Sequence, residues 1–302
     1  MKFPTQNTVS FLSKPNLRGL FNGVLLVFLF YLLYQKYPNL TEISFPSPIY
    51  LLLGILCVIP NYTLEIYKWQ LLSAQIQERT FLQAKTEVLR GLKLGILTPF
   101  MSGDYLGRSM GFNKGQRTNA ALLNFFNSIT QTWTALFFGS IALILWNIEL
   151  WEINTRVAGI ILLMISTFFL ALLLGLKVTI WKKYQAALDL PLKLKWEVIY
   201  LSLLRTLTYL LQYYFVYLAF DIQVTFMDLF IGTNLLLLAK TIGGGLNAIG
   251  DLTLRQVVSI FFFAPLGISE EKIIVATFVV WLISVFLPVF YSIFAKKHDS
   301  AV

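Results

Sequence analysis

Two polar motifs lie within apolar sequence, and their residue types suit the binding of an anion. The first motif contains Lys93, Gly103, Asp104 and Arg108, and the second contains Lys240, Gly250, Asp251 and Arg255. Each member of the second motif follows its counterpart by 147 positions, close to half of the 302-residue chain. Ionisable residues in apolar segments are costly and normally face a protein interior or an aqueous cavity. Both motifs are therefore candidate functional sites.

Arginine suits planar, bidentate contact with phosphate, and an aspartate four positions before it lies one helical turn away. Each Gly-Asp pair follows a break in apolar sequence, so we expect the aspartate to cap the helix that begins there. Two interpretations stay open. In the structural one, each aspartate caps its helix and pairs with its arginine. In the functional one, the four basic residues bind or attract the phosphate of a lipid head group, while the aspartates orient the arginines or couple to protons.

The composition is that of a polytopic membrane protein. Hydrophobic residues make up 57% and charged residues 13%, against roughly 25% charged in soluble domains. The single histidine (His298) and single cysteine (Cys57) exclude histidine-based catalysis, histidine metal sites and an intrachain disulfide. No Walker-type nucleotide loop is present. We expect no cofactor or metal, and as partner a membrane lipid rather than a nucleic acid.

Eight apolar segments define an all-α architecture. Six are long enough to span a membrane, at 17–36, 48–74, 116–147, 153–178, 195–220 and 270–295. Two others, 80–113 and 225–266, are interrupted, the first at 98–103 around Pro99 and the second at the glycines 243–245. Irregular backbone at membrane depth is tolerated inside protein or beside a water-filled cavity. Each interrupted segment is therefore predicted to be a re-entrant helical hairpin, although the chain could be counted as eight spans.

Loop charges predict the orientation of these segments. Six spans and two hairpins place every basic loop on the cytoplasmic side, as the positive-inside rule requires. Both termini are then cytoplasmic, and the hairpins enter the cytoplasmic (inner) membrane from opposite faces. The sequence thus predicts one domain, 1–302, made of two inverted repeats at approximately 17–147 and 153–295, an architecture that places a transport site at the repeat interface.

Glycines and a proline are expected to shape the two hairpins. The positions assigned to hairpin backbone are Pro99, Gly103, Gly107 and Gly250. Gly103 and Gly107 also belong to a stripe that continues at Gly111 and Gly115, one glycine every four residues. Such a stripe lets a neighbouring helix approach closely, so we expect tight packing there.

Other polar residues within spans have less specific interpretations. Asn127, Gln131 and Arg205 are candidates for lining a cavity, and the uncharged side chains serve equally well as hydrogen bonds between helices. Glu65 and Lys68, one turn apart, are expected to form a surface or interfacial pair. A tyrosine cluster suits an interfacial belt at least as well as ligand stacking; it consists of Tyr209, Tyr213, Tyr214 and Tyr217.

Both motifs resemble those of a known family. The stretch from Thr98-Pro99 to Gly103-Asp104 and Arg108 resembles Pro-x-x-x-Gly-(Glu/Asp)-x-x-(Gly)-Arg, and 250–255 resembles Gly-x-x-x-x-Arg. Both belong to the flippase-like family named after the lysylphosphatidylglycerol synthase membrane domain, and the resemblance covers essentially the whole chain. It implies an all-helical inverted-repeat domain associated with moving polar or charged lipids between leaflets. The chain stops at Val302 without room for the soluble aminoacyl-transfer domain of bifunctional members, and Asp104 replaces the glutamate of many members.

Three functions follow from this reading. The first is translocation, or binding and presentation, of an anionic or phosphate-containing lipid. The second is a membrane enzyme acting on lipid phosphates, with Asp104 or Asp251 as base and Ser109 as nucleophile. The third is a scaffold, without transport, for a separate lipid-modifying enzyme. We expect the first, and therefore no catalytic residues.

Overall fold

The computed structural model describes residues 47–96, 98, 101–146, 149–150, 153–175, 189–243 and 248–294. All of them belong to one compact unit, Ser44–Val302. The predicted span at 17–36 and Pro99 lie outside the described residues. The described part is helical apart from a hairpin of two two-residue strands, β1 (Glu149–Leu150) and β2 (Ile153–Asn154).

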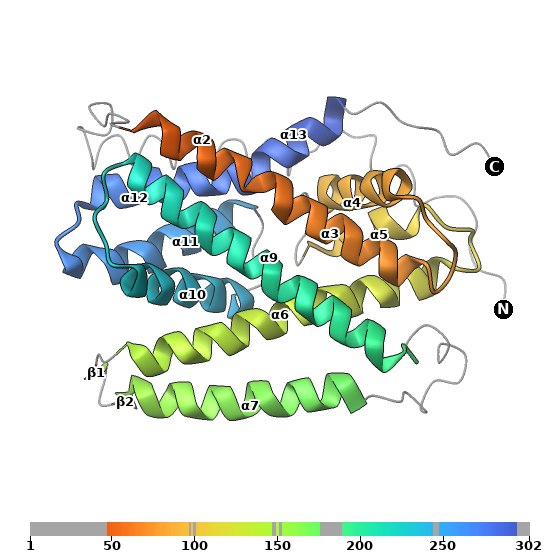
Figure 1. Ribbon diagram of the computed structural model, residues 1–302, viewed down its shortest axis with the longest axis horizontal. Helices are drawn as coiled ribbons and strands as arrows, with labels where there is room; N and C mark the ends of the chain where they lie inside the picture. Colours follow the sequence, from red (N-terminus) through yellow and green to blue (C-terminus); the bar gives the residue numbers. More distant parts are fainter. Residues whose placement is uncertain are drawn as a thin grey trace. The chain divides into compact units, whose positions relative to one another are not determined.

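The helices follow the predicted order (Figure 1). The first half contains α2 (Pro48–Leu56), α3 (Val58–Ser73), α4 (Phe81–Gly95), α5 (Ser102–Ser109) and α6 (Arg117–Leu145), followed by α7 (Thr155–Gly175). The second half contains α9 (Leu192–Ala219), α10 (Phe226–Ile242), α11 (Ala248–Phe263), the 3₁₀ turn η4 (Ala264–Leu266), α12 (Glu270–Trp281), the π-helical η5 (Leu282–Phe286) and α13 (Leu287–Phe294).

Among the described residues, four helical stretches are long and apolar enough to cross a membrane, which indicates a membrane protein. They are Pro48–Ser73, Arg117–Leu145, Thr155–Gly175 and Glu270–Ser292. These four confirm the predictions at 48–74, 116–147, 153–178 and 270–295. The segment predicted at 195–220 is also one helix, α9, of 28 residues. At 1.5 Å per residue α9 measures about 42 Å, which exceeds the roughly 30 Å of a hydrocarbon core.

Proline explains why the first of these stretches is divided. Pro60 has no N–H to donate to the carbonyl of Leu56, and its ring crowds that carbonyl. The division between α2 and α3 falls at Cys57, one residue after Leu56. Cys57 keeps a helical backbone, with φ −60° and ψ −19°, so the chain continues in the same general direction.

Both interrupted segments are pairs of consecutive helices that pack against each other, α4 with α5 and α10 with α11. The α5 helix enters from Met101, whose backbone is left-handed with φ 51°. With eight residues α5 is about 12 Å long, too short to cross a bilayer alone. A Cβ on Gly107 would lie 2.5 Å from the Cα of Gly91 on α4, whereas one on Gly115 would meet nothing within 4 Å. The glycine stripe therefore brings α5 against the backbone of α4, as predicted, but the packing ends before Gly115.

The 147-residue offset extends to the helices themselves. Adding 147 to the bounds of α4 and α5 gives 228–242 and 249–256, which lie within α10 and α11. Packing neighbours recur as well. The pairs α3–α4, α5–α6 and α3–α6 have the counterparts α9–α10, α11–α12 and α9–α12. Figure 1 shows the α4–α5 pair on one side of the described helices and the α10–α11 pair on the other.

Candidate functional site

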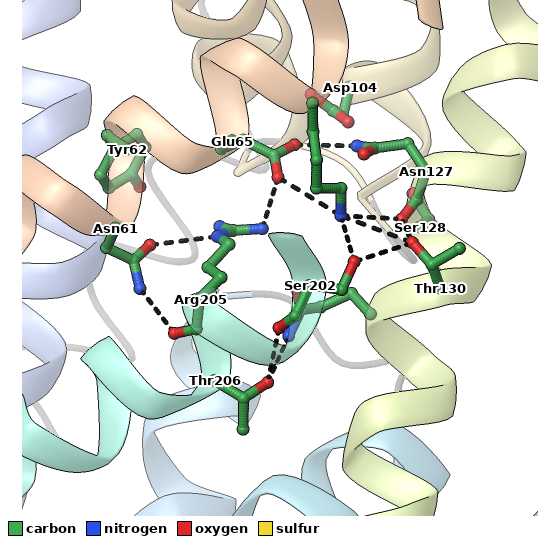
Figure 2. Close-up of polar contacts among 12 residues, drawn as sticks. Asn61, Tyr62, Glu65, Asp104, Asn127, Ser128, Thr130, Ser202, Arg205 and Thr206 are labelled. Carbon is green, nitrogen blue, oxygen red and sulfur yellow. Dashed lines mark hydrogen bonds and ion pairs between the residues drawn. The ribbon is translucent and has the colours of Figure 1, made fainter. Parts of the chain in front are cut away.

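A buried carboxylate, Glu65 on α3, is the centre of a polar cluster between α3, α5, α6 and α9. Its Oε1 accepts hydrogen bonds from Arg108 Nη2 (2.7 Å) and Asn127 Nδ2 (2.9 Å). Its Oε2 accepts one from Arg205 Nη1 (2.6 Å) and lies 3.9 Å from Lys68 Nζ. Figure 2 shows Glu65 between the α9 arginine and the α6 asparagine. One carboxylate therefore holds together side chains that are up to 140 residues apart in sequence.

The first predicted motif joins this cluster through Arg108 on α5. Arg108 Nε donates to Asp104 Oδ1 at 3.0 Å, which confirms the expected pairing across one turn. Asp104 Oδ2 accepts a hydrogen bond from Asn124 Nδ2 at 2.8 Å. The expected helix cap is wrong, because Met101 occupies the capping position and Asp104 is the third residue of the helix. Among the described residues, Arg108 Nη1 is buried without a hydrogen-bond partner.

Lys68 lies in the interior, so the expectation of a surface or interfacial pair with Glu65 is wrong. Its side chain has 0% exposure. Nζ donates to Ser202 Oγ on α9 at 2.7 Å and to Asn127 O and Thr130 Oγ1 on α6 at 3.4 and 3.5 Å. These oxygens replace water around the ammonium, as a buried charge requires. The face of α3 that carries both ions is the face covered by α6 and α9.

Arg205 is the most open cation of the cluster, with 24% of its side chain exposed. Besides its bond to Glu65, Nε donates to Asn61 Oδ1 at 3.1 Å, and Nη2 has no hydrogen-bond partner among the described residues. Asn61 Nδ2 in turn donates to Thr208 Oγ1 at 3.2 Å, and these two residues are themselves 147 positions apart. Corresponding positions of α3 and α9 therefore meet beside the cluster.

The other two candidates for lining a cavity make hydrogen bonds between helices. Asn127 is buried and donates to Glu65, and Gln131 donates to Thr206 Oγ1 at 3.0 Å and Thr134 Oγ1 at 3.1 Å. Each leaves its amide oxygen buried and without a partner. Both residues join α6 to neighbouring helices, and each retains an unused acceptor in the interior.

The second motif forms a smaller cluster around Arg255 on α11. Nε donates to Asp251 Oδ2 at 3.0 Å, the same donor atom and distance as in the first motif. Nη1 donates to the phenolic oxygen of Tyr209 on α9. Lys240 Nζ lies 3.6 Å from Asp251 Oδ1 and its side chain is 40% exposed. The helix begins at Ala248, so Asp251 is not its cap either.

Several predicted residues lie outside both clusters. Lys93 is exposed in the last turn of α4 and makes none of the contacts described above. Gly103 lies at the α4–α5 contact, where a Cβ would come within 2.3 Å of Leu94 O, and Gly250 lies in the first turn of α11. Ser109 Oγ donates to Leu106 O at 2.9 Å within its own helix.

Two of the four clustered tyrosines of α9 are packed inside the protein, while Tyr209 and Tyr214 are partly exposed. Tyr213 and Tyr217 are buried, and their ring centroids are 5.9 Å apart. Tyr209 lies 5.3 Å from Tyr213, and Tyr217 lies 5.1 Å from Phe263. These edge-to-face contacts are typical of aromatic cores, so the interfacial-belt interpretation is wrong for the buried rings of Tyr213 and Tyr217. Tyr209 has a polar role that the sequence interpretation missed.

The charges of the first cluster do not balance. Its three cations and two carboxylates leave one excess positive charge; they are Lys68, Arg108 and Arg205 against Glu65 and Asp104. An unpaired buried charge costs several kcal/mol or more, so a bound anion would stabilise this arrangement. In the part of the chain that the structure describes, no group of three His, Cys, Asp or Glu side chains could hold a metal ion.

The 147-residue offset is a sequence signal for some of the polar contacts that the sequence interpretation missed. Tyr62 and Tyr209 are a further identical pair at the 147-residue offset, and Thr130 and Thr277 are another. Both tyrosines bond across helices, Tyr62 Oη to Ser284 O at 3.1 Å and Tyr209 Oη to Arg255. Glu65 carries no such signal, because residue 212 at the corresponding position is glutamine.

No family model, no curated protein and no solved structure matches this chain. The motif resemblance to the flippase-like family therefore stays a prediction.

Proposed function

We propose that this protein binds a lipid with a phosphate-containing head group at the Glu65 cluster and moves it between the leaflets of the cytoplasmic membrane. The observation that carries the proposal is the excess positive charge buried where α3, α5, α6 and α9 meet. A phosphate group supplies the missing negative charge, and the acyl chains that accompany it favour the surrounding bilayer. Arginine is the residue best suited to hold such a group bidentately.

The proposed architecture is a pair of inverted repeats with six spans and two re-entrant hairpins. The 147-residue recurrence of helices and of their packing neighbours supports a repeat. The short α5, returning along α4 through the glycine stripe, supports a hairpin that re-enters. The basic loops support opposite orientations of the two hairpins. Sites at the interface of such repeats are typical of secondary transporters.

The accessible atoms suggest an order of contacts. Arg205 offers an unbonded Nη2 on a partly exposed side chain, so it is the first guanidinium that a head group meets. Arg108 lies deeper and offers the unpartnered Nη1. Arg255, with half-exposed Lys240 beside it, provides the corresponding position in the second half. Asp104 and Asp251 fix the arginine planes through Nε and leave the Nη atoms for the head group or for other partners.

This arrangement favours binding over chemistry on the lipid. Ser109 donates its hydroxyl to its own helix, and both oxygens of Asp104 already accept hydrogen bonds. Neither group is placed as a nucleophile or as a base. Mass spectrometry of the lipids after incubation with purified protein distinguishes the two classes, because a translocase returns every lipid chemically unchanged.

The test is a leaflet-accessibility assay in proteoliposomes with fluorescent anionic and zwitterionic phospholipids. Arg205→Ala and Arg108→Ala are each expected to slow movement of the anionic lipid at least about tenfold, which corresponds to the loss of one charge-assisted contact. Arg156→Ala, which removes an exposed arginine at the start of α7, is the matched control and should move lipid at the wild-type rate. Wild-type rates in both cluster variants, with folded protein, would contradict the proposal.

A further inference from the structure

We propose that the Glu65 carboxylate competes with a singly charged oxyanion for Arg108 and Arg205. When the oxyanion binds, it displaces Glu65 from both arginines. The carboxylate holds Arg108 and Arg205 while the site is free, and an anionic head group exchanges for it. The identification of that oxyanion as part of a lipid rests on the proposed function. The exchange itself rests on the geometry of the cluster.

The contacts of Glu65 are those that a phosphate would make. Oε1 binds Arg108 Nη2 from α5 at 2.7 Å, and Oε2 binds Arg205 Nη1 from α9 at 2.6 Å. Two oxygens on one anion thus bridge guanidinium groups from two different helices. A phosphodiester also presents two charged oxygens and matches the same donors. Arg108 Nη1 is buried without a partner among the described residues, so this site holds a donor that Glu65 and Asp104 do not use.

The cluster also contains a place for the displaced carboxylate. Lys68 lies one turn after Glu65 on α3, with Nζ 3.9 Å from Oε2. That distance is longer than a direct hydrogen bond, and the ammonium bonds to Ser202 and to α6 instead. When an oxyanion takes both arginines, a rotation about the Glu65 side chain brings its carboxylate onto Lys68. No ion is then left without a partner.

Charge balance selects the class of oxyanion. The cluster has one excess positive charge, so a monoanion such as the phosphodiester of phosphatidylglycerol makes it neutral. A phosphomonoester dianion leaves a negative excess, and a zwitterionic head group brings a cation that restores the positive one. Uncompensated charge in an interior is costly. A phosphodiester lipid without a cationic group is therefore the preferred ligand.

The second half has no carboxylate at the corresponding position. The residue 147 positions after Glu65 is Gln212, whose side-chain amide is uncharged and donates from Nε2 to Gly54 O at 3.3 Å. There Arg255 bonds to the neutral Tyr209 in addition to its own Asp251. The same helices thus pack in both halves with and without the additional charge, which points to a role for Glu65 in ligand exchange.

The experiment measures anion binding by purified protein in a neutral detergent, with a soluble short-chain phosphatidylglycerol and with inorganic phosphate as separate probes. Glu65→Gln frees both arginines while keeping the shape of the side chain. We expect it to bind the lipid probe about tenfold more tightly than wild type, the equivalent of one charge-assisted hydrogen bond. Glu197→Gln removes an equal charge from the surface of α9, where 43% of that side chain is exposed, and should leave both affinities unchanged.

Each outcome bears on the exchange. Tighter binding of the lipid probe by Glu65→Gln, together with slower lipid movement in proteoliposomes, supports it, because a head group without a competitor leaves slowly. Tighter binding of phosphate alone supports the exchange and contradicts the lipid as its source. Arginine-dependent movement with no gain in affinity for either probe overturns the exchange and leaves the proposed function intact.

A second variant guards against a folding defect. Glu65→Asp keeps the charge but is one methylene shorter, so it cannot hold both arginines at their present distances. We expect a smaller gain in affinity than in Glu65→Gln. Wild-type affinity for both probes in the folded aspartate variant would refute the exchange independently.

Discussion

Replacing Gly107 by alanine tests the packing on which the first hairpin depends. The new Cβ would lie 2.5 Å from Gly91 Cα, 2.7 Å from Gly91 N and 2.8 Å from the carbonyl carbon of Arg90. All three are backbone atoms of α4, so no side-chain rotation relieves the clash and the two helices must separate. Overpacking costs about 1–3 kcal/mol, and we take about 3 kcal/mol because the obstacle is backbone. Alanine favours the helix over glycine by about 1 kcal/mol, so the net destabilisation is about 2 kcal/mol.

That free energy is measurable as a shift in thermal unfolding. For a chain of this size about 2 kcal/mol corresponds to a fall in Tm of about 4–8 °C, read from the loss of the monodisperse peak after heating in detergent. Gly115→Ala is the matched control, because a Cβ there meets nothing within 4 Å. Its Tm should stay within about 2 °C of wild type. Equal Tm values for the two variants would refute the close approach of α5 to α4.

Two further predictions concern charge and topology. Lys68→Met removes the excess positive charge, while Ser202 and Thr130 remain bonded to each other at 3.0 Å. We expect a stability within about 1 kcal/mol of wild type and an affinity for short-chain phosphatidylglycerol reduced about tenfold. Undiminished affinity would contradict the charge-balance argument. In a Cys57→Ser background, single cysteines are placed before and after each hairpin. The two cysteines that flank one hairpin should react with a membrane-impermeant maleimide from the same side of the membrane, and those of the other hairpin from the opposite side. Reaction of the two ends of one hairpin from opposite sides would show that this hairpin crosses the membrane. The positions are Gln77 and Lys114 for the first hairpin and Gln223 and Ser269 for the second.

The helices were largely predictable because their signals are local. Long apolar runs predicted helices, and the described residues contain four that are long and apolar enough to cross a membrane, with Pro60 explaining the division of the first. The interruptions in 80–113 and 225–266 also appear where expected. Position within a helix was less predictable. Asp104 follows a break, as a cap would, but the left-handed Met101 begins the helix three residues earlier and leaves the carboxylate inside the cluster.

The site was only half predictable, because the sequence of one helix does not show which face its neighbours cover. The Asp–Arg pairs were visible, since partners four residues apart share a helical face. Glu65 and Lys68 share a face in the same way, and nothing in α3 alone distinguishes a solvated pair from a buried one. Their burial depends on α6 and α9, whose contacting residues lie 59 to 140 positions later in the sequence. The role of Tyr209 as an acceptor for Arg255 depends likewise on a contact across 46 residues.

The differences between the halves make the two arginine positions of the proposed path unequal. Both halves present an arginine whose Nε is fixed by an aspartate four residues before it, at the same 3.0 Å. The remaining partners differ: Arg108 donates to a second carboxylate, Glu65, while Arg255 donates to a neutral phenol. An anion that approaches Arg255 therefore replaces an uncharged acceptor, the Tyr209 phenol, whereas one that approaches Arg108 must replace a carboxylate, which also attracts the guanidinium by its full negative charge. Under the proposed function, the two related positions would bind the same head group with different free energies, and glutamate at 65, where the second half has glutamine at 212, contributes to the difference.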